Sequence, residues 1–557
     1  METMKDFLEY YNNLDVIPFI EAIEKMKSFY KNKKLDLFKD GVSLPGLVLK
    51  YLMRQTKYDF SLFKDEDKEL FYKLKNSIVG GPSIVFNRYQ EAGKTLIKYN
   101  KICKKIVGYD ANALYLWAIG QEMPVGDYTR VNTYDLEQLK EDILNNKLFG
   151  FIEVDIKTPL HLELYFEDMP PIFKNELIKL KDIGEHMQNF HAENNIKFIE
   201  SKQLIGSYFG EKIMLYTPLI KWYIEHGLEI IKFHCAIKYD GHKCFEEFVN
   251  EVSDARRAGD VDKSMEIIAE TMKLFGNSAY GKTITNKESF VSTTYANEIN
   301  IGKKINSPHF KDLETLHNQT YEVTSSKRQI VMDLPLQIGV AVYNLAKLRM
   351  LQFYYDCIDK YVDRSDYQIL QMDTDSNYFA FSENTLEEII KPEMREEFEN
   401  DYNNWFPSES KEPHPTFKIN NDDVSMKAYD KRKPGLFKVE CIKDKMVCLC
   451  SKMYCCSNLS EICDCCACNN RECKCIKKCS CNFKFSCKGI QHNNNKITYK
   501  RFENVLLNNT KDEVINKGFR TVNNFMKTYT QIKNGLSYSY GKRIICEDGI
   551  STKPLKI

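Results

Sequence analysis

The stretch Gln371-Met372-Asp373-Thr374-Asp375-Ser376 decides how we interpret the rest of the chain. An apolar run precedes it, Tyr367-Gln368-Ile369-Leu370, and another follows it, Asn377-Tyr378-Phe379-Ala380-Phe381, so we predict two strands joined at a tight bend. Alternation along a strand sends Asp373 and Asp375 to the same face. Two adjacent carboxylates repel each other unless a cation lies between them, and Mg²⁺ prefers such hard oxygen ligands. A polar turn without function is equally compatible with an isolated Asp-x-Asp.

The composition indicates a globular chain of several domains. Of its 557 residues 43% are hydrophobic and 28% charged, which is too long for one core and too apolar for a disordered protein. No apolar run is long enough to cross a bilayer, and the first residues do not resemble a signal peptide. We therefore expect an intracellular protein without a membrane partner, with the nucleus, the cytoplasm and the mitochondrion all left open.

The charge is distributed unevenly along the chain. The net charge is +1, but residues 488–557 carry thirteen Lys and Arg against five Asp and Glu. A basic end of this kind fits a nucleic-acid backbone and fits a merely solvated surface equally well.

Turn signals and hydrophobic periods divide the chain into segments. Residues 1–75 alternate helical patches with turns, and Gly80-Gly81-Pro82 predicts a hinge or domain junction. Asp110 ends an apolar strand that gives way to a helical segment at 111–118, a common position for a catalytic side chain. Residues 244–275 predict two helices packed as a hairpin with a break at Asp260. Residues 283–329 look polar and irregular, and a long helix is expected over 340–361.

The most specific pattern is Lys273-x3-Asn277-Ser278-x-Tyr280-Gly281. On a helix Lys273, Asn277 and Tyr280 fall at positions i, i+4 and i+7, which form one stripe. The stripe offers a charge for a phosphate, an amide, and a flat ring for a base or sugar. An ordinary amphipathic helix that ends at a glycine is the alternative interpretation.

Taken in order, Asp110-x3-Leu114-Tyr115, the segment 273–281 and Asp373-Thr374-Asp375-Ser376 resemble the polymerase signature of family B DNA polymerases. The long intervals between them resemble the protein-primed branch found in phages, linear plasmids and Maverick/Polinton transposons. Ser451-Lys452-Met453-Tyr454 resembles the Lys-x-Tyr motif of the family, which holds the primer terminus, and 434–440 resembles the apolar stretch before it. Residues 518–543 are similar to the Maverick-like group. The resemblance covers the chain from Tyr11 onward.

The resemblance implies an α/β (α+β) right hand with palm, fingers and a small thumb. It assigns residues 1–75 to a remnant of a 3′–5′ exonuclease domain, 76–158 to a linker and the palm with the first catalytic Asp, 159–240 to an insertion of the protein-primed type and palm, 241–283 to the fingers, 284–330 to a second insertion, 331–446 to the palm with Asp-Thr-Asp-Ser, 447–490 to the Lys-x-Tyr motif and a Cys-rich insertion, and 491–557 to the thumb and the basic end. The two insertions are expected to contact a terminal protein and to confer processivity.

The implied activity is DNA-directed addition of deoxynucleotides to a primer 3′-hydroxyl through two Mg²⁺ ions, with Mn²⁺ as a substitute. The expected partners are a DNA primer–template, deoxynucleoside triphosphates and a terminal protein that primes synthesis. Asp110 and Asp375 are expected to bridge both ions, with Asp373 as the weaker partner and the carbonyl of Ala111 completing one site. Nucleotide contacts are expected from Tyr115, Leu114, Lys273, Asn277 and Tyr280, and DNA contacts from Ser278, Gly281, Thr374, Lys452 and Tyr454. Within these sets, Tyr115 would exclude a 2′-hydroxyl and Lys273 would neutralise the triphosphate.

Some residues depart from the family pattern. Ala113-Leu114-Tyr115-Leu116 stands where Ser-Leu-Tyr-Pro is usual, and Gln371 where a tyrosine is frequent, but neither change removes a metal ligand. Tyr11-x3-Asp15 resembles the third exonuclease motif, whereas the two earlier motifs would precede Met1. One Asp cannot hold two metal ions, so we expect no proofreading by this chain and infer a truncated polymerase as the simplest cause.

Thirteen of the nineteen cysteines lie between Cys448 and Cys487. Paired spacings among them fit one or two structural Zn²⁺ sites, for which the candidate ligands are Cys463, Cys466, Cys473, Cys475, Cys479 and Cys481. A low-complexity insertion and free reduced thiols explain the same residues.

Two alternative functions stay open on the sequence alone. One is a catalytically dead polymerase relic that still binds DNA. The other is a zinc-stabilised nucleic-acid-binding module, in which Asp110 and Asp373 would lie far apart. Arg256, Arg257 and Lys263, on the helical hairpin, either reach phosphates or belong to a solvated face.

Overall fold

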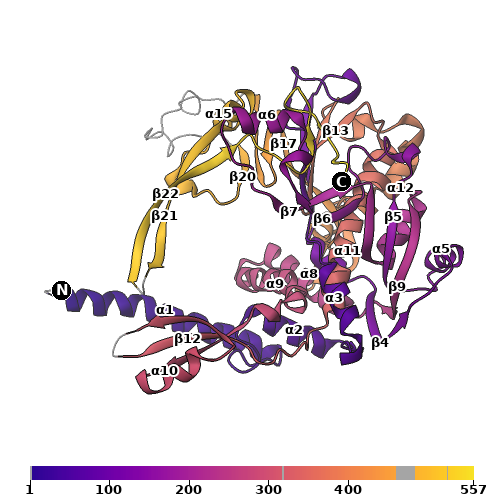
Figure 1. Cartoon of the computed structure of the whole chain (residues 1–557). Coiled ribbons are helices and arrows are strands. Elements are labelled where there is room, and N and C mark those ends of the chain that lie inside the picture. Colours follow the sequence, from indigo (N-terminus) through magenta and orange to yellow (C-terminus); the bar gives the residue numbers. More distant parts are fainter. Residues whose placement is uncertain (1–2, 317–318, 460–482, 523–524) are drawn as a thin grey trace.

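A five-stranded antiparallel sheet, ordered β1-β13-β14-β3-β17, forms the centre of the molecule (Figure 1). The strands are β1 (Ser83–Val85), β3 (Lys105–Ala111), β13 (Tyr367–Asp373), β14 (Ser376–Phe381) and β17 (Phe437–Lys443). The structure is a computed structural model that describes residues 3–316, 319–459, 483–522 and 525–557. Its mixture of helices and sheets confirms the predicted α/β class.

Each face of this sheet packs into a different hydrophobic core. Phe379 and Phe381 of β14 belong to the larger core, whereas Tyr378 and Ala380, which alternate with them, belong to the smaller one. All six residues of β14 are buried, so helices or strands cover the sheet on both sides. This burial explains why the run 377–381 is apolar without interruption.

Helix α11 (Leu336–Gln352) covers the face that belongs to the larger core and continues as the π-helix η8 (Phe353–Asp359). The ring of Phe353 stacks on Phe437 of β17 with centroids 3.7 Å apart. The predicted long helix is confirmed, and it begins four residues earlier than expected, at Leu336. Residues on all sides of α11 are buried, as expected for a helix in the middle of a large core.

The opposite face packs on a second sheet, ordered β2-β18-β19-β20. Its strands are β2 (Tyr89–Glu91), β18 (Lys445–Cys450), β19 (Met453–Ser457) and β20 (Lys484–Cys487), and α15 (Tyr499–Leu507) lies against it. Because β17 runs almost directly into β18, the chain passes from the central sheet to this one within two residues.

The segment between β3 and the helical hairpin builds a third sheet, ordered β4-β9-β5-β8. It consists of β4 (Met123–Val131), β5 (Gly150–Lys157), β8 (Phe209–Tyr216) and β9 (Glu229–His242), with α5 (Leu136–Leu144) and α7 (Thr217–Glu225) packed on it. Strands β6 (Ile172–Ile178) and β7 (Ser201–Ser207) form a separate antiparallel pair. Helix α6 (Glu185–Glu193) lies between them along the chain.

The predicted helical hairpin is confirmed as α8 (Glu246–Val261) and α9 (Glu266–Ser278). The break falls at residues 262–265, slightly after Asp260. The two helices approach closely where Gly259 faces Ala269, since a Cβ on Gly259 would lie only 2.4 Å from the Ala269 Cβ.

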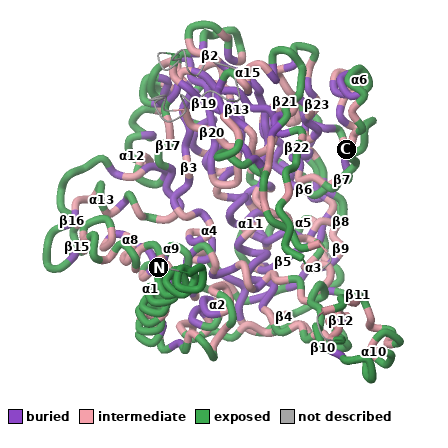
Figure 2. The backbone as a smooth tube through the Cα atoms, turned by 90° about the vertical axis from the view of Figure 1, so that its left-hand side faces the viewer, coloured by how far each residue is buried: buried purple, intermediate pink, exposed green. Residues whose placement is uncertain are grey.

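Two sequence expectations about less regular segments were wrong. Residues 4–32 form a single helix, α1 (Met4–Asn32), which passes through Pro18 and begins with a capping box at Thr3. The segment after residue 283 contains a three-stranded sheet, β10 (Val291–Ala296), β12 (Tyr321–Ser326) and β11 (Phe310–Thr315), with helix α10 (Glu298–Ile305). The two outer strands, β10 and β11, are mostly exposed, so the sheet carries little hydrophobic alternation that would have revealed it (Figure 2).

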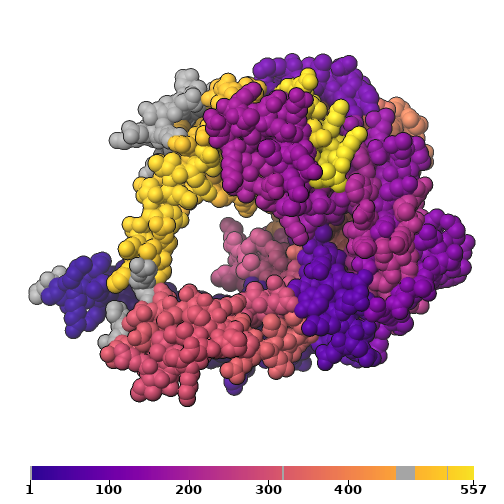
Figure 3. Space-filling model, in the orientation of Figure 1, coloured from indigo at the N-terminus to yellow at the C-terminus, as the bar shows by residue number. Residues whose placement is uncertain are grey.

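A long hairpin of β21 (Lys511–Val522) and β22 (Phe525–Ser537) projects from the second sheet toward α1 and the β10–β12 sheet (Figure 1). Figure 3 shows the result, an opening bordered by this hairpin on one side and by the β10–β12 segment on another. After the hairpin the chain returns to the central sheet, where it ends near β23 (Ile544–Ile545) and β24 (Thr552–Lys553). Within the described ranges no helix combines the length and apolar character of a membrane span.

Two short helices precede β1, α2 (Leu44–Gln55) and α3 (Lys68–Asn76), and a short α4 (Leu114–Ile119) follows β3. Between β14 and β17 lie α12 (Arg395–Trp405), the hairpin of β15 (Pro413–Ile419) and β16 (Asp422–Ser425), and α13 (Met426–Asp430). The predicted domain boundaries, including the exonuclease remnant, stay predictions; Asp15, its only candidate ligand, is exposed on α1.

Candidate active site

The turn between β13 and β14 carries the Asp-Thr-Asp motif. Asp373 ends β13, and the N–H groups of Thr374 and Asp375 donate to the carbonyls of Pro82 and Asp373, both at 2.8 Å. The predicted bend is confirmed, but Asp375 lies in the turn and not on a strand. Strand alternation was therefore the wrong reason to place Asp375 beside Asp373, since the tight turn places it.

Strand β3 brings Asp110 to the same turn. Asp110 is the register partner of Ser376, and the Ala111 N–H donates to the Asp375 carbonyl at 2.7 Å. Burial, followed by the negative charges of Asp110 and Asp373, raises the pKa of the Asp375 carboxyl to about 6. Acids far apart in the sequence thus meet closely enough to oppose one another's ionisation.

Two lysines contact these carboxylates. Lys438, the register partner of Asp110 on β17, lies 2.8 Å from Asp110 Oδ2, and Lys452 lies 2.6 Å from Asp373 Oδ1. Lys452 also donates to Thr374 Oγ1 at 3.3 Å. The predicted DNA contact Lys452 is therefore at the turn, whereas Lys438 was not singled out from the sequence.

The backbone around the turn is strained at three non-glycine residues. Positive φ angles occur at Ala113 (43°), Thr374 (67°) and Lys452 (59°). Such a conformation costs on the order of 1–3 kcal/mol per residue and persists only where the surroundings impose it. One such residue lies in each of three predicted motifs: Ala113 follows Asp110, Thr374 lies between Asp373 and Asp375, and Lys452 belongs to Lys-x-Tyr. Strained residues that gather in this way are typical of a functional site.

Aromatic rings close the site on the side of α8 and α9. Tyr115 of α4 and Tyr280, directly after α9, lie with ring centroids 4.7 Å apart. Tyr343 of α11 contacts both rings edge-on, at 6.0 Å from Tyr115 and 5.5 Å from Tyr280. Sequence reasoning missed Tyr343, because a tyrosine on a buried helix carries no motif.

Helix α9 presents the predicted stripe. Lys273 and Asn277 are exposed, and Lys273 Nζ lies 3.2 Å from Glu270 Oε2. Ser278 is half-buried, and nothing lies within 4 Å of a Cβ built on Gly281, so both sides of this helix end are open. The one-face arrangement of the stripe is consistent with a helix, while its contacts with nucleotide and DNA stay predictions.

Three other residues that were candidates for contacts with nucleotide or DNA have buried side chains. Leu114 is buried in the larger core, which leaves its main chain for any nucleotide contact. Tyr454 is buried too, with its hydroxyl 3.2 Å from the hydroxyl of Tyr378. Arg257 is neither a phosphate contact nor a solvated charge: it is buried, donates to the Tyr429 carbonyl and stacks on the Tyr429 ring at 3.7 Å.

The segment expected to be a hinge, Gly80-Gly81-Pro82, lines the site. A Cβ on Gly81 would lie 2.6 Å from Thr374 Cγ2 and 3.1 Å from the Tyr115 hydroxyl. The carbonyl of Val79, just before, accepts a hydrogen bond from the buried Lys347 of α11. The glycine pair was noticed in the sequence, but only the fold reveals that Gly81 must lack a side chain.

The oxygen atoms of the turn fit a divalent cation. Asp110, Asp375, Asp373 and the Ala111 carbonyl supply hard donors, and the raised pKa of Asp375 indicates that added positive charge would be favourable there. Among the described residues no three carboxylate, thiol or imidazole side chains converge tightly enough to hold an ion by themselves. Mg²⁺ does not require that, since it binds through one or two carboxylates together with substrate phosphates and water.

Comparison with known proteins decides between the possibilities. The family described as DNA polymerase type B, organellar and viral, matches residues 2–359, which is more than half of the chain. The chain belongs to this family. No curated protein matched it.

The fold of this chain is similar to that of one solved DNA polymerase structure. The phi29 DNA polymerase complexed with single-stranded DNA is 12% identical with a TM-score of 0.50, and the match covers 96% of this chain and 73% of that one. The phi29 polymerase complexed with primer–template DNA and incoming nucleotide is 13% identical with a TM-score of 0.48, covering 89% and 68%. At such identities the likeness extends to the fold alone.

The polymerase is therefore a DNA-directed DNA polymerase of a family that uses divalent metal ions. The alternative of a zinc-stabilised module without polymerase history is wrong, since Asp110 and Asp373 both lie at the β13–β14 turn. The cysteines for which zinc was predicted, Cys463, Cys466, Cys473, Cys475, Cys479 and Cys481, lie outside the described residues.

Replacing Gly81 by Ala is expected to lower the rate of primer extension about 10–100-fold. The new methyl would push the Thr374 side chain, and a displacement of about 1 Å at a catalytic turn has effects of that size. Gly80→Ala is the matched control, because nothing lies within 4 Å of its added Cβ. Single-turnover extension rates of the two variants check this, and equal rates would contradict the steric role of Gly81.

Proposed function

We propose that this polymerase extends primed DNA by Mg²⁺-dependent phosphoryl transfer at the turn of Asp373, Thr374 and Asp375. The observation that carries the proposal is the meeting of Asp110 and Asp375 at one turn, where burial, followed by the charge of Asp110, raises the pKa of Asp375 to about 6. Phosphoryl transfer depends on positioning and charge neutralisation more than on covalent help from the protein. A site that gathers acids, lysines and rings suits that chemistry.

Each residue has a proposed role in that reaction. Asp110, Asp375 and the Ala111 carbonyl would hold Mg²⁺, and Asp373 would support them. The ions would activate the primer 3′-hydroxyl and neutralise charge on the triphosphate. Lys273 and Asn277 approach the triphosphate from α9, Tyr115 and Tyr280 enclose the sugar and base, and Lys452 holds the primer end.

Tyr115→Val is expected to raise the use of ribonucleotides relative to deoxynucleotides about 100-fold. The ring of Tyr115 is fixed between Tyr280 and Tyr343, so it would exclude a 2′-hydroxyl that the shorter side chain admits. Ratios of kcat/KM for dNTP and rNTP give the measurement. Tyr115→Phe keeps the ring and is expected to keep the ratio; a ratio equally unchanged in Tyr115→Val would remove Tyr115 from this role.

Protein priming is proposed on narrower grounds. The segments 159–240 and 284–330 are the extra material that resembles the protein-primed branch, and the Maverick/Polinton-like origin rests on residues 518–543 alone. A labelled deoxynucleotide transferred to a protein hydroxyl without a DNA primer tests it. A strict requirement for a DNA or RNA primer, with every candidate terminal protein, would exclude it.

A polymerase relic that binds DNA without catalysis is the second candidate. It is favoured by the ion pairs Lys438–Asp110 and Lys452–Asp373, which occupy two of the three carboxylates. Template-directed extension of a labelled primer with Mg²⁺ separates the two functions. Extension whose product follows the template supports the polymerase, and binding of primer–template without any extension supports the relic.

A further inference from the structure

Lys542, near the end of the chain, lies close to the turn of Asp373, Thr374 and Asp375, although it belongs to none of the predicted site motifs. Its Nζ donates to the Ser83 carbonyl at 2.9 Å, and Ser83 is the register partner of Asp373. The Ser451 hydroxyl, adjacent to Lys452, donates to the same carbonyl. Lys542 and Ser451, the neighbour of Lys452, therefore meet at one carbonyl on the edge of the central sheet, where the charges of Asp373 and Lys452 both act on Lys542.

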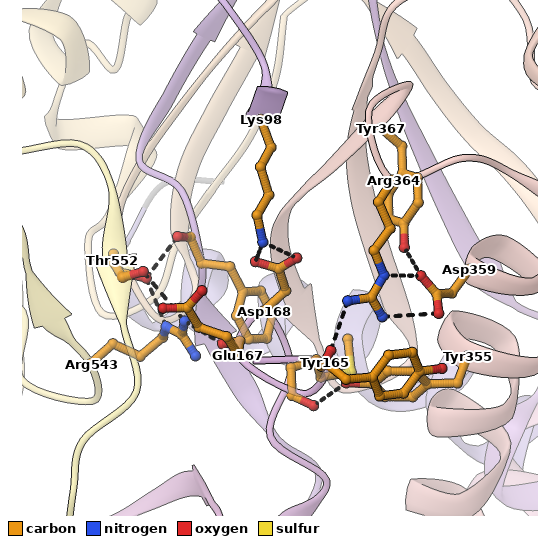
Figure 4. A network of polar contacts seen from close by, with 12 residues as sticks. Lys98, Tyr165, Glu167, Asp168, Tyr355, Asp359, Arg364, Tyr367, Arg543 and Thr552 are labelled. Atoms are coloured by element: carbon orange, nitrogen blue, oxygen red, sulfur yellow. Dashed lines mark hydrogen bonds and ion pairs between the residues drawn. The ribbon is translucent and has the colours of Figure 1, made fainter. Parts of the chain in front are cut away.

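The neighbours of Lys542 fix its position. Two residues before it, the Tyr540 hydroxyl accepts the Val85 N–H at 2.8 Å. One residue after it, Arg543 donates to the Thr552 hydroxyl at 2.7 Å and to the Glu167 carbonyl at 3.0 Å (Figure 4). Thr552 in turn donates to the Phe86 carbonyl at 2.7 Å. Both ends of this short segment are thus bound to the strand β1 region, so Lys542 is held at the turn before any ligand arrives.

The charge of Lys542 is incompletely compensated. It is half-buried, and in the part of the chain that the structure describes its Nζ contacts an uncharged carbonyl and forms no ion pair. Burial lowers its pKa to about 8, so the ammonium is still mostly protonated at neutral pH. The charges of Asp373 and Lys452 act on this ammonium in opposite directions, so binding of an anion would relieve the remaining cost of its desolvation.

We infer that Lys542 binds a phosphate of the primer strand near its 3′ end, beside the contact proposed for Lys452. This inference rests on the proposed function. The edge of Ser83, Ser451 and Lys452 is where the Lys-x-Tyr motif places the primer terminus, whereas the triphosphate is proposed to approach from Lys273 on α9. A fixed ammonium at this edge neutralises the primer backbone and aligns it with Asp373.

Lys542→Met is expected to weaken binding of a primer–template duplex about tenfold, without nucleotide present, as measured by fluorescence anisotropy. Because one phosphate contact is lost, the slope of log Kd against log salt concentration should fall by about one. At saturating DNA the KM for the nucleotide is expected to stay unchanged. Lys542→Arg keeps the charge and should keep the slope.

Lys553→Met is the matched control, since it removes the same charge from an exposed position in the same C-terminal segment and should change nothing. Thermal unfolding shows whether Lys542→Met is folded; if it is not, Lys542→Gln, which removes the charge but keeps a donor for the Ser83 carbonyl, takes its place in the salt titration. An unchanged slope in folded Lys542→Met, or a raised KM for the nucleotide with unchanged DNA affinity, overturns the inference. A failure of the unmodified chain to extend any primer would instead overturn the proposed function.

Discussion

Replacing Asp375 by Asn is expected to lower primer extension at least about a thousandfold while leaving DNA binding nearly intact. The amide keeps the shape of the side chain but removes the negative charge that holds a divalent ion, and each factor of ten corresponds to about 1.4 kcal/mol of transition-state stabilisation. Lys452 and Lys542, which are proposed to contact the primer strand, are unaffected. The loss should therefore appear in kcat and not in the Kd for primer–template.

The same substitution is expected to maintain or raise thermal stability. Burial and the charges of Asp110 and Asp373 raise the pKa of Asp375 to about 6, above its ordinary value of 3.8. Above a pH of about 6 the ionised carboxylate is therefore destabilising in the fold, and this effect disappears as the pH falls below about 4. Asn removes the penalty, so the thermal midpoint at pH 7.5 in EDTA should not fall.

Extension assays at saturating DNA and thermal scans check both effects together. Asp422→Asn, an exposed acid on β16, is the control and should alter neither. A variant that lost activity through a drop in stability would contradict this account, as would a variant that still extended primers at the normal rate.

The sequence predicted that the three acids meet, because spacing and residue type together are specific there. Three short motifs in order implied that Asp110, Asp373 and Asp375 meet, and the pairing of β3 with β14 places them at one turn. The long helix and the helical hairpin followed from their hydrophobic periods. The roles of individual residues at the site stay predictions.

What the sequence did not predict has a common physical cause. Gly81, Tyr343 and Lys542 matter through close contacts between segments distant along the chain, and such contacts leave no local pattern. The β10–β12 sheet escaped notice because polar strands lack alternation. The unbroken length of helix α1 was not predicted, because Pro18 normally ends a helix and here does not.

Arg88→Met is expected to lower the free energy of unfolding by about 3–5 kcal/mol. The guanidinium is fully buried and donates to the carbonyls of Tyr538 at 2.6 Å and of Leu449 and Gly549, both at 3.3 Å. Its carbon lies 4.2 Å from the centre of the Tyr538 ring. Each buried carbonyl that loses its donor costs about 1–3 kcal/mol.

An opposing effect limits the loss but does not cancel it. Burial lowers the pKa of Arg88, so removing the charge relieves some desolvation, and a buried ion pair replaced as a whole by apolar groups is often nearly neutral. Here only the donor can be replaced, because the three acceptors belong to the backbone. The unsatisfied carbonyls therefore decide the sign, and the thermal midpoint should fall.

The damage is expected to concentrate where the C-terminal segment joins the second sheet. Tyr538 and Gly549 flank Lys542, so loosening them should expose residues 538–550 to protease before the rest of the chain unfolds, and should weaken primer–template binding as Lys542→Met does. Arg328→Met, at an exposed arginine, serves as the control and should stay within about 0.5 kcal/mol. Uniform destabilisation with unchanged DNA affinity would show that Arg88 supports the core without positioning Lys542.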